Sequence, residues 1–176
     1  GISHDLGTII TRIKLRLELI ENQKEIIEIK KDVEIMQVFL KEYLEYSKEN
    51  FVNKFSKVNL SEIVYKVVES SKLNKKLNVK CAKNIYVHTD RNSLYRIIFN
   101  LFENASKYGQ EVNITVKRHE KRVVIDIEDD GPGIDQEFRK KVFKPFYKID
   151  ESRNLNKGGS GLGLSIANEL AKKIKA

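Results

Sequence analysis

The stretch RIIFNLFENASKYG, residues 96–109, decides what kind of domain this chain builds. Its apolar residues return every three or four positions, which predicts an amphipathic helix that ends at a glycine. Four polar residues of this helix share one face or adjacent faces: Asn100, Asn104, Lys107 and Tyr108. An amide oxygen can ligate Mg²⁺, a lysine can neutralise phosphate charge, and a tyrosine can cover a base. The helix is therefore a candidate wall of a nucleotide pocket.

The segment EDDGPGID, residues 128–135, follows a predicted strand. The carboxylate of Asp129 can accept a hydrogen bond from the exocyclic amine of adenine. Gly131 and Gly133 let the backbone approach a flat ring closely. An Asp-Gly pair is also a common turn former, so this segment alone leaves both interpretations open.

A second glycine-rich segment, GGSGLGLS at residues 158–165, precedes the last predicted helix. Gly159, Gly161 and Gly163 stand at its start, where free N–H groups and the helix dipole favour phosphate. A glycine run is equally typical of a linker. The three segments together, in this order, indicate a nucleotide-binding domain more strongly than any of them does alone.

The remaining elements of the second half alternate between strands and helices. Residues 58–71 indicate a short strand running into a helix, and residues 78–90 indicate one or two strands. Residues 111–131 alternate apolar and polar positions around a tight turn, which predicts a hairpin. A short helix is expected around 135–142, a polar stretch over 148–159, and a helix at the end of the chain.

The first fifty residues read as two helices with a heptad seam. The seam positions are Leu6, Ile10, Ile13, Leu17 and Ile20, then Ile26, Ile29, Val33, Met36, Leu40 and Tyr43. The polar break at 21–24 is short enough to predict an antiparallel hairpin. Such a hairpin cannot bury its seam alone, so we expect two copies to form a four-helix bundle. The predicted fold is α+β: hairpin 1–50, linker 51–57, and an α/β sandwich over 58–176.

One histidine lies on the polar side of the first helix, in SHDLGTIITRI at residues 3–13. On a helical wheel His4 and Thr8 lie opposite the seam, and Asp5 lies a quarter-turn to the side. A solvated polar face would look the same. A neutral imidazole is also a good nucleophile, a neighbouring carboxylate can take its proton, and a hydroxyl one turn away can position a water.

Composition limits the function classes. The chain has 176 residues, a formal charge of +8 and no apolar run of membrane-spanning length, and its sequence predicts no signal peptide. Residues 1–50 hold 8 Lys and Arg against 10 Asp and Glu, whereas residues 51–176 hold 25 against 15. The lysines are scattered rather than interleaved with aromatics, which disfavours nucleic acid as a partner. The one cysteine, Cys81, excludes an internal disulfide and is expected to be a small strand hydrophobe.

Taken together, these segments resemble the catalytic core of a sensor histidine kinase over nearly the whole chain. SHDLGTIITRI is similar to the H box, in the form found in osmosensor-type kinases, RIIFNLFENASKYG to the N box and DDGPGI to the first glycine box. VFKPFYK resembles the F box and GGSGLGLS the second glycine box, with an ATP lid between them. The resemblance adds the following residues to the implied nucleotide site: Phe143, Tyr147, Lys148, Leu162 and Leu164.

The resemblance implies ATP-dependent autophosphorylation with Mg²⁺ on His4 and transfer to an aspartate of a response-regulator receiver domain. Asp5 would be the acid/base, Thr8 would support phosphatase activity towards the regulator, and Asn104 would ligate the metal. It also implies a homodimer that belongs to the cytoplasmic portion of a bacterial inner-membrane sensor. No membrane contact is expected of these residues.

Two departures from the family pattern bear on activity. The family has arginine, threonine and proline after His-Asp-Leu, where this chain has Gly7, Thr8 and Ile9. Family members continue with two more strands after the last helix, so we expect a C-terminally truncated sheet with an exposed edge. Two rival functions stand ahead of a third, a basic nucleic-acid binder, for which salt-sensitive DNA binding would be the test. One is a gyrase- or Hsp90-type ATPase in which Glu103 activates water, and the other is a dimeric ATP-binding scaffold or phosphatase without kinase turnover.

Overall fold

The computed structural model divides the chain into two compact units, Gly1–Val52 and Asn53–Ala176. It describes residues 10–15, 17, 26–27, 29–30, 33, 36–37, 40, 54–70, 75–82, 84–120, 122–149 and 161–176. Among these residues, no helix combines the length and the apolar character that a bilayer crossing requires.

Every described residue of the first unit is helical. Four predicted seam residues are buried in one cluster, against which Leu40 packs: Ile10, Leu17, Ile26 and Val33. Three others remain open, with Ile13 at 39%, Ile29 at 43% and Met36 at 53% exposure. The predicted turn at 21–24 and the segment with His4 lie outside the described residues. Among the seam residues that the structure describes, one group is therefore covered within the unit and another is not.

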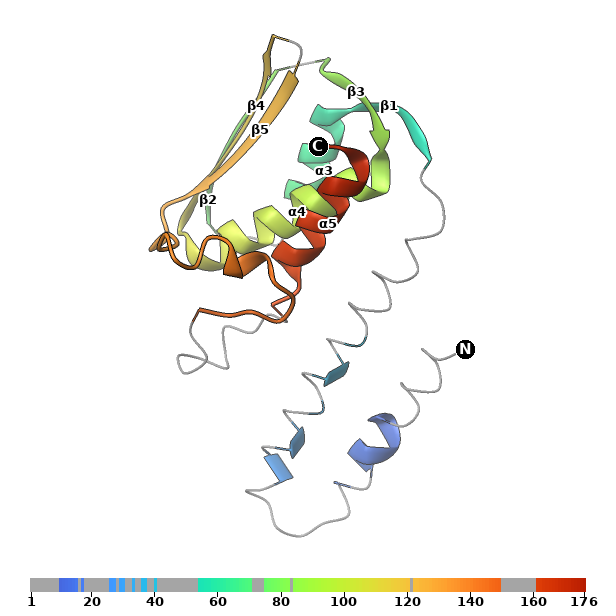
Figure 1. Ribbon diagram of the computed structural model, residues 1–176, viewed down its shortest axis with the longest axis vertical. Coiled ribbons are helices and arrows are strands. Elements are labelled where there is room, and N and C mark those ends of the chain that lie inside the picture. Colours follow the sequence, from blue (N-terminus) through green and yellow to red (C-terminus); the bar gives the residue numbers. More distant parts are fainter. Residues whose placement is uncertain are drawn as a thin grey trace. The chain divides into compact units, whose positions relative to one another are not determined.

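The second unit is a two-layer α/β domain (Figure 1). Its elements follow the order β1 (Phe55–Asn59), α3 (Leu60–Ser70), β2 (Lys76–Cys81), β3 (Tyr86–Asp90), α4 (Arg91–Tyr108), β4 (Glu111–His119), β5 (Arg122–Asp129), the 3₁₀ helix η2 (Lys141–Phe143) and α5 (Gly163–Ile174). Strand β1 pairs antiparallel with β3 in a two-stranded sheet. A second sheet has the order β2-β4-β5, with a parallel β2–β4 pair and an antiparallel β4–β5 pair. The three helices lie on one side of this larger sheet.

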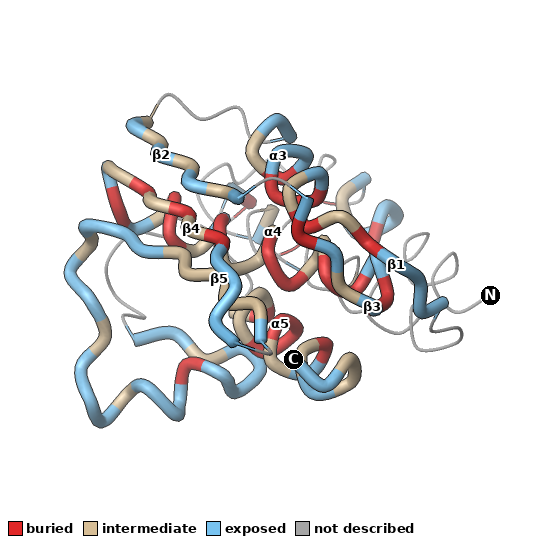
Figure 2. Tube along the Cα trace, turned by 90° about the horizontal axis from the view of Figure 1, so that it is seen from above, coloured by how far each residue is buried: buried red, intermediate tan, exposed pale blue. Residues whose placement is uncertain are grey.

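Helix α4 forms the centre of the core because its apolar residues repeat at helical spacing. Leu94, Ile98, Phe102 and Ala105 are buried in one cluster with the inward residues of β4. Phe102 and Ile114 have no exposed surface at all. Figure 2 shows this buried band running along α3 and α4 and across β4. Truncation of a fully buried phenylalanine costs about 3–5 kcal/mol in general, so this contact anchors α4 to the sheet.

The sequence-based expectations for the second unit hold for α4, α5 and the β4–β5 hairpin, and fail in two places. Residues 55–57, predicted as linker, form the first half of β1 because they pair with Asp90, Thr89 and His88 of β3. The helix expected at 135–142 is a series of turns over 136–140 followed by η2. Within η2 only Val142 is buried, so the segment has too little apolar contact to stabilise a full α-helix.

Candidate functional site

A cavity of about 330 Å³ lies between α4 and β5. Its lining residues are Leu101, Asn104 and Ala105 from α4, and Ile125, Asp126, Ile127, Glu128 and Asp129 from β5. The pairing register places Asp129 opposite Val112, on the same face of β5 as Ile125 and Ile127. That face points towards the helices, so Asp129 places a carboxylate in line with two apolar residues of the same strand face. The cavity thus joins two residues that the sequence predicted from separate segments, Asn104 and Asp129.

The Asp129 carboxylate is oriented by its own turn. Its Oδ1 accepts a hydrogen bond from the backbone N–H of Gly131 at 2.9 Å. A Cβ on Gly131 would lie 2.5 Å from Asp129 Oδ1 and 3.1 Å from the carbonyl oxygen of Tyr108, so only glycine fits there. One carboxylate oxygen is therefore held by the protein, and the other can accept a hydrogen bond from a ligand amine.

Two asparagines of α4 take different positions. Asn104 lines the cavity. Asn100, one turn earlier, faces the start of α5: a Cβ on Gly163 would lie 3.7 Å from Asn100 Oδ1. The Nδ2 of Asn100 is buried and has no hydrogen-bond partner among the described residues. A buried amide donor is rarely left unpaired, so this atom fits an additional acceptor at the junction of α4 and α5.

The last turn of α4 carries Lys107 and Tyr108. The ammonium group of Lys107 lies 5.1 Å from the centroid of the Tyr108 ring. Tyr108 is half exposed, and neither side chain is part of the cavity lining. The structure places this pair at the end of the wall that holds Asn104.

The backbone of the second glycine-rich segment meets Phe146. Phe146 donates its N–H to the carbonyl of Gly161 at 3.1 Å. Gly161 has φ of +74°, and a Cβ there would lie 2.9 Å from the carbonyl carbon of Phe146. Helix α5 then begins at Gly163, after the buried residue Leu162, and Leu164 lies in its first turn. The first N–H groups of a helix have no intrahelical acceptor, so this start can receive an anion.

Several predicted residues lie apart from the cavity or outside the described part of the chain. Phe143, Tyr147 and Lys148 are not among the cavity-lining residues, and Phe143 is exposed. Gly133 is exposed and has φ of +74°, and a Cβ at this position would have no described atom within 4 Å. Four residues lie outside the described residues: His4, Asp5, Thr8 and Gly159. The predicted roles of all these residues stay predictions.

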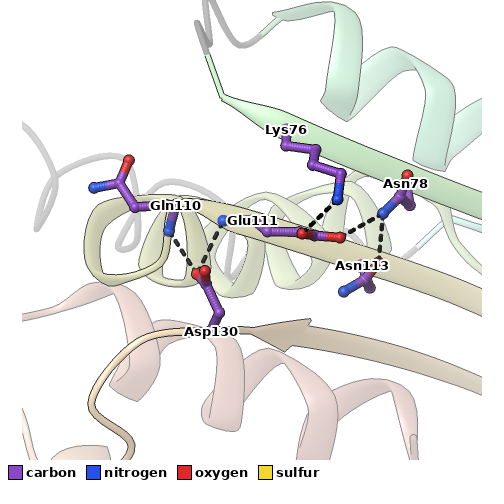
Figure 3. A network of polar contacts seen from close by, with 6 residues as sticks. All are labelled: Lys76, Asn78, Gln110, Glu111, Asn113 and Asp130. Atoms are coloured by element: carbon purple, nitrogen blue, oxygen red, sulfur yellow. Dashed lines mark hydrogen bonds and ion pairs between the residues drawn. The ribbon is translucent and has the colours of Figure 1, made fainter.

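The sequence did not predict two residues that stabilise the backbone beside the site, Lys75 and Asp130. Lys75 donates from Nζ to the carbonyls of Ser106 and Gly109, the second at 2.6 Å. Asp130 Oδ1 accepts from the N–H groups of Glu111 at 2.9 Å and Gln110 at 2.6 Å (Figure 3). These backbone hydrogen bonds, from Glu111 first and then Gln110, lower the pKa of Asp130, and the charge of Lys75 adds to the effect. Neither contact has a local sequence signal, because both join elements distant in the chain.

The donor set suits a metal that arrives with a nucleotide rather than one held by the protein alone. Within the described ranges, no group of three or more His, Cys, Asp or Glu residues is arranged to bind a metal ion. Mg²⁺ is commonly held by one or two protein oxygens together with substrate phosphates and water. The side-chain amide of Asn104 fits that role. Glu103, by contrast, is exposed and is not part of the cavity lining, which leaves it badly placed to activate water there.

Comparison with known proteins agrees with this geometry. Residues 89–176 match the family described as histidine kinase-, DNA gyrase B-, and HSP90-like ATPase, which covers half of the chain. The chain belongs to this ATPase family. The match begins at the end of β3 and includes α4, β4, β5 and α5, so it contains every residue that lines the cavity.

The relatives of this ATPase-family chain are sensor kinases. It is 30% identical over 183 residues to the sensor protein RstB of Escherichia coli K12, covering 97% of this chain and 42% of RstB. It is 31% identical over 180 residues to the sensor histidine kinase CpxA of the same strain, covering 94% of this chain and 39% of CpxA. The histidine protein kinase SaeS of Staphylococcus aureus USA300 is 42% identical over 91 residues, 49% of this chain and 26% of SaeS. The chain therefore spans less than half the length of these curated relatives.

Solved structures share the fold. The mycobacterial sensor histidine kinase MprB superposes with a TM-score of 0.61 at 24% identity, over 69% of this chain and 81% of that one. Full-length ShkA, crystallised in complex with AMPPNP, superposes with a TM-score of 0.70 at 19% identity, over 97% of this chain and 39% of ShkA. At these identities the likeness shows the fold, and it agrees with the ATPase family matched over residues 89–176.

Proposed function

We propose that this chain is the catalytic core of a sensor histidine kinase, which binds ATP and phosphorylates itself on His4. The observation that carries the proposal is the shared cavity of Asn104 and Asp129, which lies inside the matched ATPase domain. The structure of ShkA, which shares the fold and was crystallised in complex with AMPPNP, supports nucleotide binding by a domain of this kind. No described residue favours the rival in which Glu103 activates water.

In this proposal the adenine base lies against Asp129, whose free carboxylate oxygen accepts a hydrogen bond from the exocyclic amine. The backbone at Gly131 and Gly133 lies along the ring, and Asn104 ligates a Mg²⁺ ion that would neutralise phosphate charge. The remaining nucleotide contacts are assigned to Asn100, Lys107, Tyr108, Phe143, Tyr147, Lys148, Gly159, Gly161, Leu162, Gly163 and Leu164. The start of α5 faces the phosphates, because its free N–H groups suit negative charge.

The reaction is a phosphoryl transfer from ATP to an imidazole nitrogen of His4. The bond between the γ-phosphorus and the β,γ-bridging oxygen breaks, ADP leaves with that electron pair, and a new phosphorus–nitrogen bond forms. Asp5 takes the proton that the imidazole loses. Such transfers depend mainly on alignment and charge stabilisation, which is the task of the cavity residues and the start of α5.

The phosphorylated His4 then serves as donor to an aspartate on the receiver domain of a response regulator. In the reverse direction, Thr8 positions a water for hydrolysis of that aspartyl phosphate, which would make the chain a phosphatase as well. In the sequence, Gly7 lies between Asp5 and Thr8, and Ile9 follows Thr8. These two residues replace an arginine and a proline of the family pattern. The balance between the two activities therefore depends on this turn of the helix.

The first unit is proposed to be the dimerisation and phosphotransfer hairpin, residues 1–50. Its open apolar residues Ile13, Ile29 and Met36 lie at seam positions, so a second copy that completes a four-helix bundle would cover them. The segment around the boundary at Val52 and Asn53 then connects the hairpin to the ATP-binding domain. We propose that the chain belongs to the cytoplasmic portion of a bacterial membrane sensor; the names of the relatives support a bacterial sensor protein.

The test is incubation with γ-³²P-ATP and Mg²⁺ of the chain and three variants: His4→Ala, Asn104→Ala and Asn92→Ala. Asn92 is an exposed asparagine on the same helix and serves as the matched control. We expect acid-labile, alkali-stable label on the chain and on Asn92→Ala, and none on His4→Ala. Asn104→Ala should lose about 100-fold or more of the labelling rate, because one electrostatic contact to the transferring group is absent. Label that persists in His4→Ala would contradict the assignment of the acceptor.

A further inference from the structure

The turn between α4 and β4 is held by side chains from two other elements. Lys75, just before β2, donates from Nζ to the carbonyls of Ser106 and Gly109. Asp130, just after β5, accepts through Oδ1 from the N–H groups of Gln110 and Glu111 (Figure 3). We call these contacts the clasp, formed by Lys75, Ser106, residues 109–111 and Asp130. It satisfies carbonyls at the end of α4 and N–H groups at the start of β4.

Glu111 connects the clasp to the rest of the sheet edge. Its backbone N–H donates to Asp130, while its carboxylate accepts from Lys76 and from Asn78 of β2, each at 2.8 Å. Asn78 also donates to Asn113 at 2.9 Å. Figure 3 shows the two sets of contacts meeting at Glu111. The starts of β2 and β4 and the end of β5 are thereby tied to one turn.

The turn that the clasp holds lies very close to Asp129. A Cβ on Gly109 would lie 2.8 Å from Asp129 Cβ and 2.9 Å from Asp130 Oδ1. Gly109 has φ of −90°, which any residue adopts, so glycine is required here for space and not for conformation. On the other side, Gly131 approaches the Tyr108 carbonyl with similar closeness. A displacement of the turn therefore moves the backbone that carries the Asp129 carboxylate.

We propose that Asp130 and Lys75 are positioning residues for base selectivity: they hold the α4–β4 turn so that the Asp129 carboxylate meets the exocyclic amine of adenine. This inference rests on the proposed function, in which Asp129 reads the base. Neither residue is among those that line the cavity. We expect Asp130 and Lys75 to affect how strongly the chain prefers one purine over another. A small shift of the Asp129 carboxylate would remove its hydrogen bond with the exocyclic amine of adenine. We expect the contacts between the protein and the phosphates of the nucleotide to stay unchanged when Asp130 or Lys75 is replaced.

The experiment compares binding of Mg²⁺-ADP and Mg²⁺-IDP by titration calorimetry. Hypoxanthine carries a carbonyl where adenine has the exocyclic amine, so the ratio of the two dissociation constants reports on the Asp129 contact. We expect the chain to prefer ADP by about 10- to 100-fold. Asp130→Ala should lower this preference to about threefold or less, and Asp130→Asn, which keeps an acceptor oxygen, should restore most of it.

A second variant and a control make the outcome independent of folding. Lys75→Met removes the ammonium group from the other side of the turn and should also lower the preference for ADP. Glu169→Ala removes an exposed carboxylate on α5 that pairs with Lys172, and should leave the preference unchanged. Circular dichroism and urea unfolding establish that each variant is folded before the ratio is compared. If Asp130→Ala does not fold, the ratio of the ADP and IDP dissociation constants of Lys75→Met tests the inference instead.

The outcomes separate this inference from the proposed function. No preference for ADP in the unaltered chain would overturn the reading of adenine by Asp129, and the inference with it. A clear preference that survives unchanged in the folded Asp130→Ala and Lys75→Met variants would overturn the inference alone. Loss of the preference in both variants, with recovery in Asp130→Asn, would establish that the clasp positions the Asp129 carboxylate.

Discussion

The two ends of α4 are held by the same chemical device in different surroundings. At the start, Asp90 accepts from the N–H of Ser93 at 2.7 Å and from the N–H of Lys54 at 3.1 Å. Beyond the end, Asp130 accepts from two N–H groups in the same way. Asp90 and Ser93 are buried, with 7% and 5% exposure, whereas Asp130 and Gln110 are exposed.

The difference in burial decides how much each carboxylate contributes to the stability of the domain. Water cannot replace the buried acceptor at Asp90, so its loss leaves N–H groups unpaired and costs stability. Water can reach the N–H groups that face Asp130, so its loss costs little stability and releases the turn instead. The same contact thus stabilises the domain at one end of the helix and positions a side chain at the other.

The largest effect is expected for Asp90→Ala. The variant loses the N-cap of α4 and one tie to the backbone before β1, and we expect the free energy of unfolding to fall by about 2 kcal/mol. Urea unfolding, with a midpoint that shifts at an unchanged slope, measures this loss. Asp135→Ala, which removes an exposed aspartate, is the control. A shift no larger than that of the control would mean that burial does not distinguish the two ends.

A smaller loss is expected for Gly109→Ala. The added methyl group would press on Asp129 Cβ and Asp130 Oδ1, and such overpacking costs about 1–1.5 kcal/mol where the backbone can move slightly. The preference for ADP over IDP should fall as well, because Asp129 is displaced. Gln110→Ala keeps both the backbone N–H and the space, and should change neither quantity. Full stability together with full selectivity in Gly109→Ala would contradict the close approach.

The pH dependence of stability sharpens the comparison at Asp90. Burial acts to raise the pKa of this carboxyl, but hydrogen bonds from Ser93 and the Lys54 N–H, aided by the charge of Lys173, outweigh it and lower the pKa below the ordinary value of 3.8. A depressed pKa in the folded state contributes stability at neutral pH that disappears as the pH falls through that value.

The test compares the chain with Asp90→Asn in urea at pH 7, 5, 4 and 3. The gap in unfolding midpoint between the two proteins should be full at pH 7, should begin to shrink as the pH falls below the ordinary carboxyl pKa of 3.8, and should go on closing as Asp90 takes up a proton in the folded state. Asp130 titrates equally in both proteins, so it does not affect the difference. A gap that stays constant or widens on acidification would show that the charge of Asp90 is not what stabilises the cap.

The smallest effect on stability is expected for Asp130→Ala. Its two N–H donors lie at the surface, so solvent accepts their hydrogen bonds and the urea midpoint should stay close to that of the unaltered chain. Measured beside Asp90→Ala, it should show the smaller shift by a clear margin. An equal shift in the two variants would remove the distinction between a stabilising and a positioning carboxylate.

Much of this domain follows from local sequence. The spacing of Leu94, Ile97 and Ile98 predicts α4, and alternation along 111–131 predicts the hairpin whose inner face carries Asp129. Patterns of this kind are local because helix and strand periodicity act within a few residues. Asp90 was not among the predicted residues, and the structure shows both its cap contact with Ser93 and its contact with Lys54.

The sequence by itself therefore determined most of the helices and strands, the residue types of the candidate site, and the family to which they point. Only the tertiary structure decided which strand pairs with residues 55–57, that Asn104 and Asp129 share one cavity, and that Lys75 and Asp130 close on one turn. The physical reason is that periodicity sets which face of an element is apolar, whereas pairing, close packing and side-chain contacts to backbone groups join residues that lie far apart along the chain.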